Sequence, residues 1–151
     1  MTRRLLDIGV LGSVVLLAAA GLGWTAAQPG DQPAVNAVFR ALDVVIDSGE
    51  SELAAYQFEL RVPKGVELVG VENGEHPAFA KAPYYDPRAL GGGRIIIAAF
   101  DTGDDLPTGK TRVCRVHVRE TVPGARYNIK LTVAADADGR SIEADIEIHE
   151  E

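Results

Sequence analysis

The stretch that most constrains the fold is residues 53–74, LAAYQFELRVPKGVELVGVENG. In it, Tyr56, Phe58, Leu60 and Val62 alternate with polar or charged residues. A period of two predicts a strand that buries one face and leaves the other in water. A proline–lysine–glycine break follows, and a second apolar segment ends at an asparagine–glycine pair. The stretch therefore predicts two consecutive strands joined by a turn.

Further strand-like segments lie on both sides of this stretch. They are residues 38–46, 94–101, 110–120, 127–133 and 142–148. Polar turns separate them, and no amphipathic helix of any length interrupts them. Seven or eight such strands are typical of a β-sandwich or barrel, so the predicted fold class is all-β over residues 34–151. The run RIIIAAFD at 94–101 is continuously apolar, which predicts a strand buried on both faces.

Charge excludes some classes of partner. The formal net charge of −7 includes +1 from Arg3, Arg4 and Asp7, so the remainder of the chain carries −8. An acidic domain does not suit nucleic acid, whose phosphates require a basic face. Its net charge also argues against a domain that lies flat on anionic lipid.

The single cysteine, Cys114, excludes an intrachain disulfide. In a strand, its side chain shares a face with Val116 and Val118, while Arg115 and His117 occupy the opposite face. We therefore expect a small buried apolar side chain rather than a reactive thiol, which would need exposure and nearby positive charge.

Residues 8–27, IGVLGSVVLLAAAGLGWTAA, form a run of twenty residues without a charge. As a helix, this run would span about 30 Å, the thickness of the hydrocarbon core of a bilayer. It predicts a single-pass anchor in a bacterial inner membrane. The basic residues Arg3 and Arg4 predict a cytoplasmic amino terminus and an extracytoplasmic domain. The residues expected to contact the membrane are Ile8, Leu11, Val14, Leu17 and, at the outer interface, Trp24.

A cleaved signal peptide is the alternative interpretation of this segment. Thr25, Ala26 and Ala27 would supply the small-residue exit that such peptides need before Gln28. The length of the apolar run favours the anchor. In either case, the proline- and glycine-containing residues 28–33 form a polar linker to the domain.

Four segments resemble the cohesin domain family. AAYQFELRVPKGVELVGVENGE is similar to the cohesin strand A-G-F-x-F-x-L and the segment V-L-E-V-V-x-V that follows it. GGGRIIIAAFDT, LPTGKTRVCRVHVRE and ADADGRSI resemble the later strands and the closing turn. The resemblance covers roughly residues 34–148 and implies a jelly-roll-like antiparallel β-sandwich, related to some carbohydrate-binding modules. The sequence differs from cellulosomal scaffolds because it holds one module and no dockerin segment, so no dockerin-contact residues are assigned.

The loop at residues 76–88, HPAFAKAPYYDPR, brings aromatic side chains into a chain that is poor in them. Exposed tyrosines are effective anchors at protein interfaces. We therefore predict that Phe79, Tyr84, Tyr85 and Arg88 bind a protein partner. The alternative is that one or more of these aromatic residues pack under the loop.

No segment carries the pattern of a catalytic or metal site. Carboxylates gather in the turns at 101–105 and 136–138, but solvated turn residues explain them better than calcium does. The three histidines, His76, His117 and His149, lack metal-ligand spacing, and no nucleophile motif is present. We therefore expect no catalytic residue, no metal and no cofactor.

These expectations combine into a non-catalytic, membrane-anchored domain that makes protein–protein contacts. An accessory or assembly subunit of a larger membrane complex, for example a respiratory or photosynthetic one, fits this combination. The alternative is a secreted cohesin-like or carbohydrate-binding module. Sugar binding would require a planar row of aromatic side chains on one face of the domain.

Overall fold

A computed structural model describes residues 36–150. The predicted anchor over residues 8–27, with Ile8, Leu11, Val14, Leu17 and Trp24, lies outside these residues, as does the linker at 28–33. Within the described part of the chain, no helix is both long and apolar enough to cross a bilayer. Its elements are β1 (Val38–Asp47), β2 (Ala55–Arg61), β3 (Val66–Glu72), η1 (Pro77–Phe79), η2 (Pro87–Ala89), β4 (Arg94–Phe100), β5 (Lys110–Glu120), β6 (Asn128–Ala135) and β7 (Asp145–Glu150).

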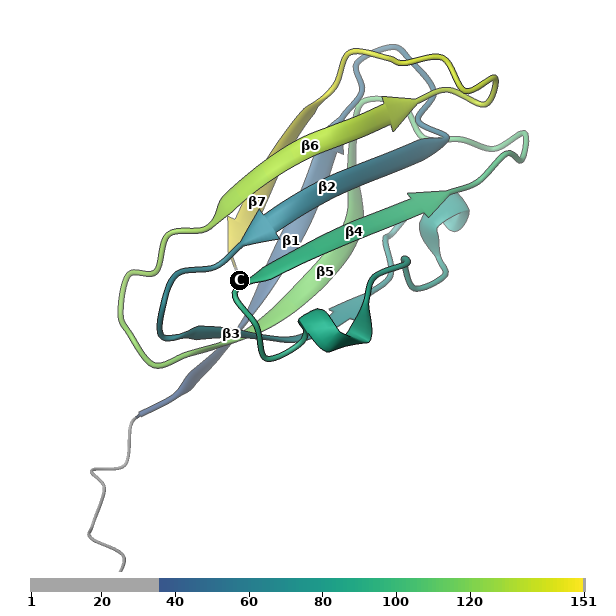
Figure 1. Ribbon diagram of the computed structural model, residues 1–151. Coiled ribbons are helices and arrows are strands. Elements are labelled where there is room, and N and C mark those ends of the chain that lie inside the picture. Colours follow the sequence, from purple (N-terminus) through teal and green to yellow (C-terminus); the bar gives the residue numbers. More distant parts are fainter. Residues whose placement is uncertain (1–35, 151) are drawn as a thin grey trace, which may run out of the picture. The chain divides into compact units, whose positions relative to one another are not determined.

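The seven strands within residues 36–150 form two antiparallel sheets that face one another (Figure 1). One sheet has the order β3-β5-β1-β7, and the other has the order β4-β2-β6. Every neighbouring pair is antiparallel, and η1 and η2 are single 3₁₀ turns between β3 and β4. The predicted all-β sandwich is confirmed.

The core lies between the two sheets and follows the two-residue period of the sequence. On β2, Tyr56, Phe58 and Leu60 are buried, while the residues between them face outward. The opposite sheet buries alternate residues of β1 and β5 against them. These facing residues are Leu42, Val44, Ile46, Val113, Val116 and Val118. Cys114 is also fully buried, as predicted, next to a shift in the register between β1 and β5.

The expectation that residues 94–101 are buried on both faces is wrong. β4 is an edge strand of the three-stranded sheet, and only its inward residues Ile95 and Ile97 are fully buried. On the outer face, Ile96 and Phe100 remain 40% and 65% exposed. Nothing in the described chain forms a layer over this face, so a strand that is apolar on both sides exposes half of its apolar residues.

The last strand begins later than the sequence pattern predicts. The pattern places residues 142–144 in it, but β7 starts at Asp145 and continues to Glu150. Ser141 instead bridges to Ala135, and the Ile142 amide donates to the Ala134 carbonyl at 3.0 Å. The chain therefore pairs briefly with β6 in one sheet before it joins β1 in the other.

Gly74 lies where the 73–93 segment returns against β5. Its amide donates to the carbonyl of Phe79 at 2.8 Å. A β-carbon at Gly74 would lie 2.8 Å from the carbonyl oxygens of Arg112 and Val113, and 2.9 Å from Cβ of Phe79. Because two of these atoms belong to the backbone, the surroundings have little freedom to move.

We predict that Gly74→Ala lowers the free energy of unfolding by about 1–3 kcal/mol, the usual cost of overpacking. Chemical denaturation followed by circular dichroism measures the change. Gly70→Ala is the matched control, because a β-carbon added at Gly70 would meet no atom within 4 Å. Equal stability of the two variants would contradict the close approach at Gly74.

Candidate interaction surface

Phe79 attaches the 76–88 loop to the core. Its side chain is 1% exposed and packs edge-on against Tyr56, with ring centroids 5.1 Å apart and planes at 76°. The prediction that Phe79 contacts a partner is therefore corrected: it is a core residue. Sequence alone could not show this, because Tyr56 and Phe79 are separated by a turn and a whole strand.

Tyr84 extends the three-stranded sheet beyond β4 by one residue. Its amide donates to the Ala98 carbonyl at 2.7 Å, and the Ala98 amide donates to the Tyr84 carbonyl at 3.0 Å. Opposite residues of an antiparallel pair share a face, so the Tyr84 side chain lies on the outer face of β4. There its ring stacks with that of Phe100, with centroids 6.1 Å apart and planes at 14°.

Four residues form an apolar surface that we call the β4 strip: Tyr84, Ile96, Ala98 and Phe100. Alternation along β4 places the three residues that this strand contributes, Ile96, Ala98 and Phe100, on the same outer face. Tyr84 and Phe100 are 68% and 65% exposed, although large aromatic side chains are usually buried. A hollow of about 290 Å³ adjoins both rings. The strip is a continuous apolar surface at an edge of the sandwich.

The other two predicted partner-binding residues lie differently. Tyr85 is partly buried and packs against the core, so only part of it is accessible. The Arg88 side chain is 90% exposed, and it donates to both carboxylate oxygens of Asp86. This bond holds the pKa of Asp86 below its ordinary value. Arg88 also lines a hollow that includes Ile96, so it borders the β4 strip.

Polar groups cover the part of the outer face next to the strip. Glu59 on β2 lies opposite Ile96 and accepts hydrogen bonds from Arg94, at 2.9 Å from Nε, and from Arg61. These guanidinium groups, first Arg94 and then Arg61, lower the pKa of Glu59. Beyond them, the Gln57 side chain donates to the Thr132 hydroxyl at 3.1 Å. The apolar strip is therefore bordered by polar side chains held in defined positions.

Sequence reasoning missed Ile96 and Phe100 as surface residues. Their spacing of four along a strand did place them on one face with Ala98 between them. The signal was ambiguous, because Ile95, Ile97 and Ala99 make the opposite face equally apolar. Only the packing of the opposite sheet shows which face of β4 is covered.

The described residues provide no accessible thiol nucleophile. Cys114 is fully buried, and burial raises the pKa of its thiol, which disfavours the reactive thiolate. Each histidine lies near a carboxylate instead of another histidine. The Nε2 atoms of His76, His117 and His149 lie 3.8, 2.9 and 3.1 Å from Asp105, Glu72 and Glu147.

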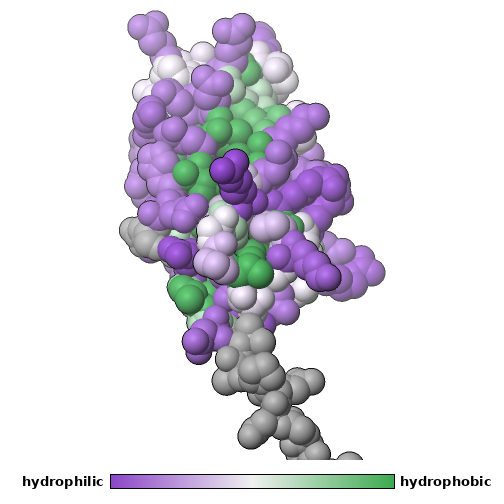
Figure 2. Space-filling view, turned by 90° about the vertical axis from the view of Figure 1, so that its left-hand side faces the viewer, coloured by the Kyte–Doolittle hydropathy of each residue, from purple (hydrophilic) through white to green (hydrophobic). Residues whose placement is uncertain are grey.

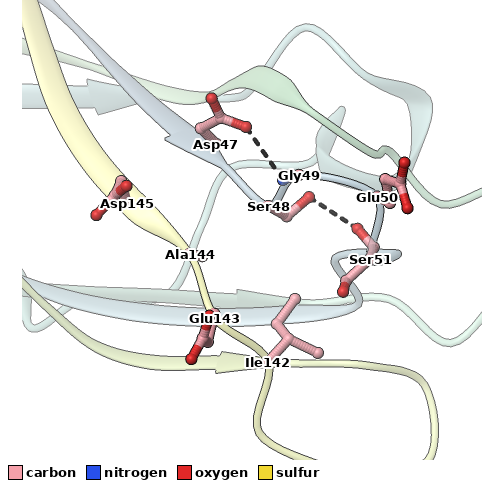
Figure 3. A pocket seen from close by; sticks show the side chains of 9 residues that line it. All are labelled: Asp47, Ser48, Gly49, Glu50, Ser51, Ile142, Glu143, Ala144 and Asp145. Carbon is pink, nitrogen blue, oxygen red and sulfur yellow. Dashed lines mark hydrogen bonds between the residues drawn. The ribbon is translucent and has the colours of Figure 1, made fainter.

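A hollow of about 810 Å³ is open and lined by acidic residues. It lies between the β1–β2 turn and residues 142–145 (Figure 3). The carboxylates of Asp47, Glu50, Glu143 and Asp145 point in different directions in this view. Within residues 36–150, no three histidine, cysteine or acidic side chains converge as metal ligands. The turn at 136–140 is held instead by Asp136, which accepts from the backbone amide of residue 138 at 3.0 Å.

We predict that Arg94→Gln raises the pKa of Glu59 towards its ordinary value, because it removes the largest stabiliser of the carboxylate. Arg61→Gln should raise the pKa by less, since Arg61 is the second cause. A carbon-13 NMR titration of the glutamate carboxyl groups measures both shifts. A larger shift in the Arg61 variant would show that the network is arranged differently.

Comparison with known proteins identifies the fold but not a family. No protein-family model matches the chain, and no curated protein matches it in sequence. Among solved structures, it is similar to a non-cellulosomal cohesin from the hyperthermophilic archaeon Archaeoglobus fulgidus, with a TM-score of 0.52. The match covers 70% of this chain and 72% of the other, at 18% identity. The two antiparallel sheets and this likeness together show that the chain has a cohesin-like fold.

Proposed function

We propose that this chain is a non-catalytic, membrane-anchored domain whose β4 strip binds another protein. The observation that carries the proposal is the stacked pair of Tyr84 and Phe100, each about two-thirds exposed. Fully burying one such side chain is worth about 1.5–3 kcal/mol relative to leaving it in water. A partner that covers both rings would gain this free energy on binding. The described chain does not gain it on folding, because it leaves both rings exposed.

The surroundings of the strip resemble the composition of known protein interfaces. Such interfaces combine an aromatic or apolar centre with a polar rim, and arginine and tyrosine are enriched in them. Here Arg94, Arg61 and Glu59 border the strip on one side, and Arg88 borders it near Ile96. Because Glu59 already pairs with two arginines, a partner would meet oriented charges rather than mobile ones.

The cohesin-like fold is consistent with a binding role, although fold alone does not establish function. The proposed anchor is the uncharged run 8–27, and Arg3 and Arg4 support a cytoplasmic amino terminus. On this basis we place the domain on the outer side of a bacterial inner membrane. An accessory or assembly subunit of a larger membrane complex would use both a tether and a binding face.

The test begins with the full chain extracted from its native membrane in mild detergent. We expect a defined partner to co-purify and to shift the chain to a larger species in native electrophoresis. The double variant Tyr84→Ala/Phe100→Ala should then bind the identified partner at least about tenfold more weakly, as expected for aromatic anchors. Binding is measured with the purified components.

Phe39→Ala is the matched control, because Phe39 is also 68% exposed but lies on β1 in the other sheet. It should bind the partner as the unaltered chain does. A chain that remains monomeric at all concentrations would count against the proposal. Binding of the strip to insoluble polysaccharide, with no protein partner, would support the secreted carbohydrate-binding alternative.

A further inference from the structure

The two ends of the sandwich differ in charge. At one end, residues 47–52, 101–109 and 136–145 contain ten aspartates and glutamates and a single basic residue, Arg140. At the other end, residues 36–40, 62–65 and 121–126 contain three basic residues and no acidic one. Two glutamates at strand ends lie beside them: Glu120 pairs with Arg40, and Glu150 lines the same hollow as Arg126. The net charge of the whole chain, −7, does not show this difference between the two ends.

The three segments without acidic residues meet at one end, which we call the amino-proximal end because β1 begins there. Val38 at the start of β1 pairs with Glu120 at the end of β5, and Arg61 at the end of β2 pairs with Asn128. The Thr121 amide also donates to the Gly65 carbonyl at 2.7 Å. In Figure 1, the turns between β2 and β3 and between β5 and β6 lie together at the left.

Apolar side chains are exposed at this end. Phe39, Val38 and Val122 are 68%, 49% and 38% exposed. Val38 and Val122 line one hollow of about 130 Å³. Figure 2 faces this side of the molecule and shows hydrophobic surface, in green, between hydrophilic groups.

Two of the three cations in these three segments form no ion pair with another described residue. Among the described residues, Lys64 and Arg126 form no ion pair. Arg40 instead pairs with Glu120 at 2.9 Å, and Glu120 is only 4% exposed. The end therefore presents unpaired positive charge next to exposed apolar side chains, which suits the boundary between headgroups and acyl chains.

We propose that the amino-proximal end docks onto an anionic lipid surface. This inference rests on the proposed membrane anchor. Only residues 28–35 separate the apolar run 8–27 from Asn36, and eight residues reach at most about 28 Å. A tether of this length limits the distance between this end and the anchor to about 28 Å, so the end can reach the range, about 10 Å, over which surface charge acts at moderate salt. The same surface repels the acidic end, so the domain is oriented by attraction at one end and repulsion at the other.

The full chain in lipid vesicles tests this docking. In a Cys114→Ala background, Val122→Cys or Ala137→Cys carries an environment-sensitive fluorophore, at the amino-proximal or the acidic end. Vesicles contain phosphatidylcholine with or without phosphatidylglycerol, plus a spin-labelled lipid that quenches fluorescence on contact. We expect quenching at position 122 only with phosphatidylglycerol, its loss in high salt, and no quenching at position 137.

Charge reversal separates electrostatic docking from simple proximity. Lys64→Glu/Arg126→Glu should abolish quenching at position 122 while the chain still floats with the vesicles. Lys81→Glu/Arg140→Glu, the matched control, reverses two charges towards the acidic end and should leave quenching unchanged. Circular dichroism checks that each variant is folded.

Flotation and quenching distinguish the two proposals. A chain that floats with the vesicles but shows no quenching at position 122 retains the anchor and overturns the docking. Quenching that survives Lys64→Glu/Arg126→Glu, or that occurs only after a protein partner is added, also overturns it. A chain that does not float with the vesicles contradicts the anchor, and the docking proposal fails with it.

Discussion

The side chain of Tyr56 connects the core to the candidate interaction surface. Its hydroxyl donates to the Val113 carbonyl at 3.0 Å, which joins β2 of one sheet to β5 of the other. Burial raises the pKa of this hydroxyl, so it remains a protonated donor. The Tyr56 ring also receives the edge of Phe79, which seats the 76–88 loop. That loop also carries Tyr84, which pairs with Ala98 of β4, so the side chain that joins the two sheets also packs against the loop that brings an aromatic residue to the surface.

The β4 strip lies on the outer face of an edge strand. A central strand has a hydrogen-bonded neighbour on each side, but β4 pairs with β2 and, on its other side, only with Tyr84 in the described chain. Its outer face combines two stacked rings with an ion-paired network around Glu59. This combination of rigid apolar area and oriented charge supports the proposed role in protein binding, since little ordering would be required when a partner docks.

Charge distribution changes how an acidic domain can meet a membrane. The total charge argued against contact with anionic lipid, and that argument holds for a domain lying on its side. The antiparallel register instead collects the acidic turns at one end and leaves Lys64 and Arg126 at the other. If the domain docks by that end, the β4 strip along the side of the sandwich stays open to a partner. The two proposed contacts are therefore compatible.

The sequence by itself determined the features that depend on local periodicity. Alternation predicted the strands, the inward side chains of β2 and the buried position of Cys114, because neighbouring residues in a strand point to opposite faces. The tertiary structure alone decided that Phe79 is a core residue, that Ile96 and Phe100 face water, and that the charges separate by end. Each of these depends on strand order or on contacts between distant segments, such as Tyr56 with Phe79 and Tyr84 with Ala98. A local pattern shows neither which face of a strand the opposite sheet covers nor which distant segments come together.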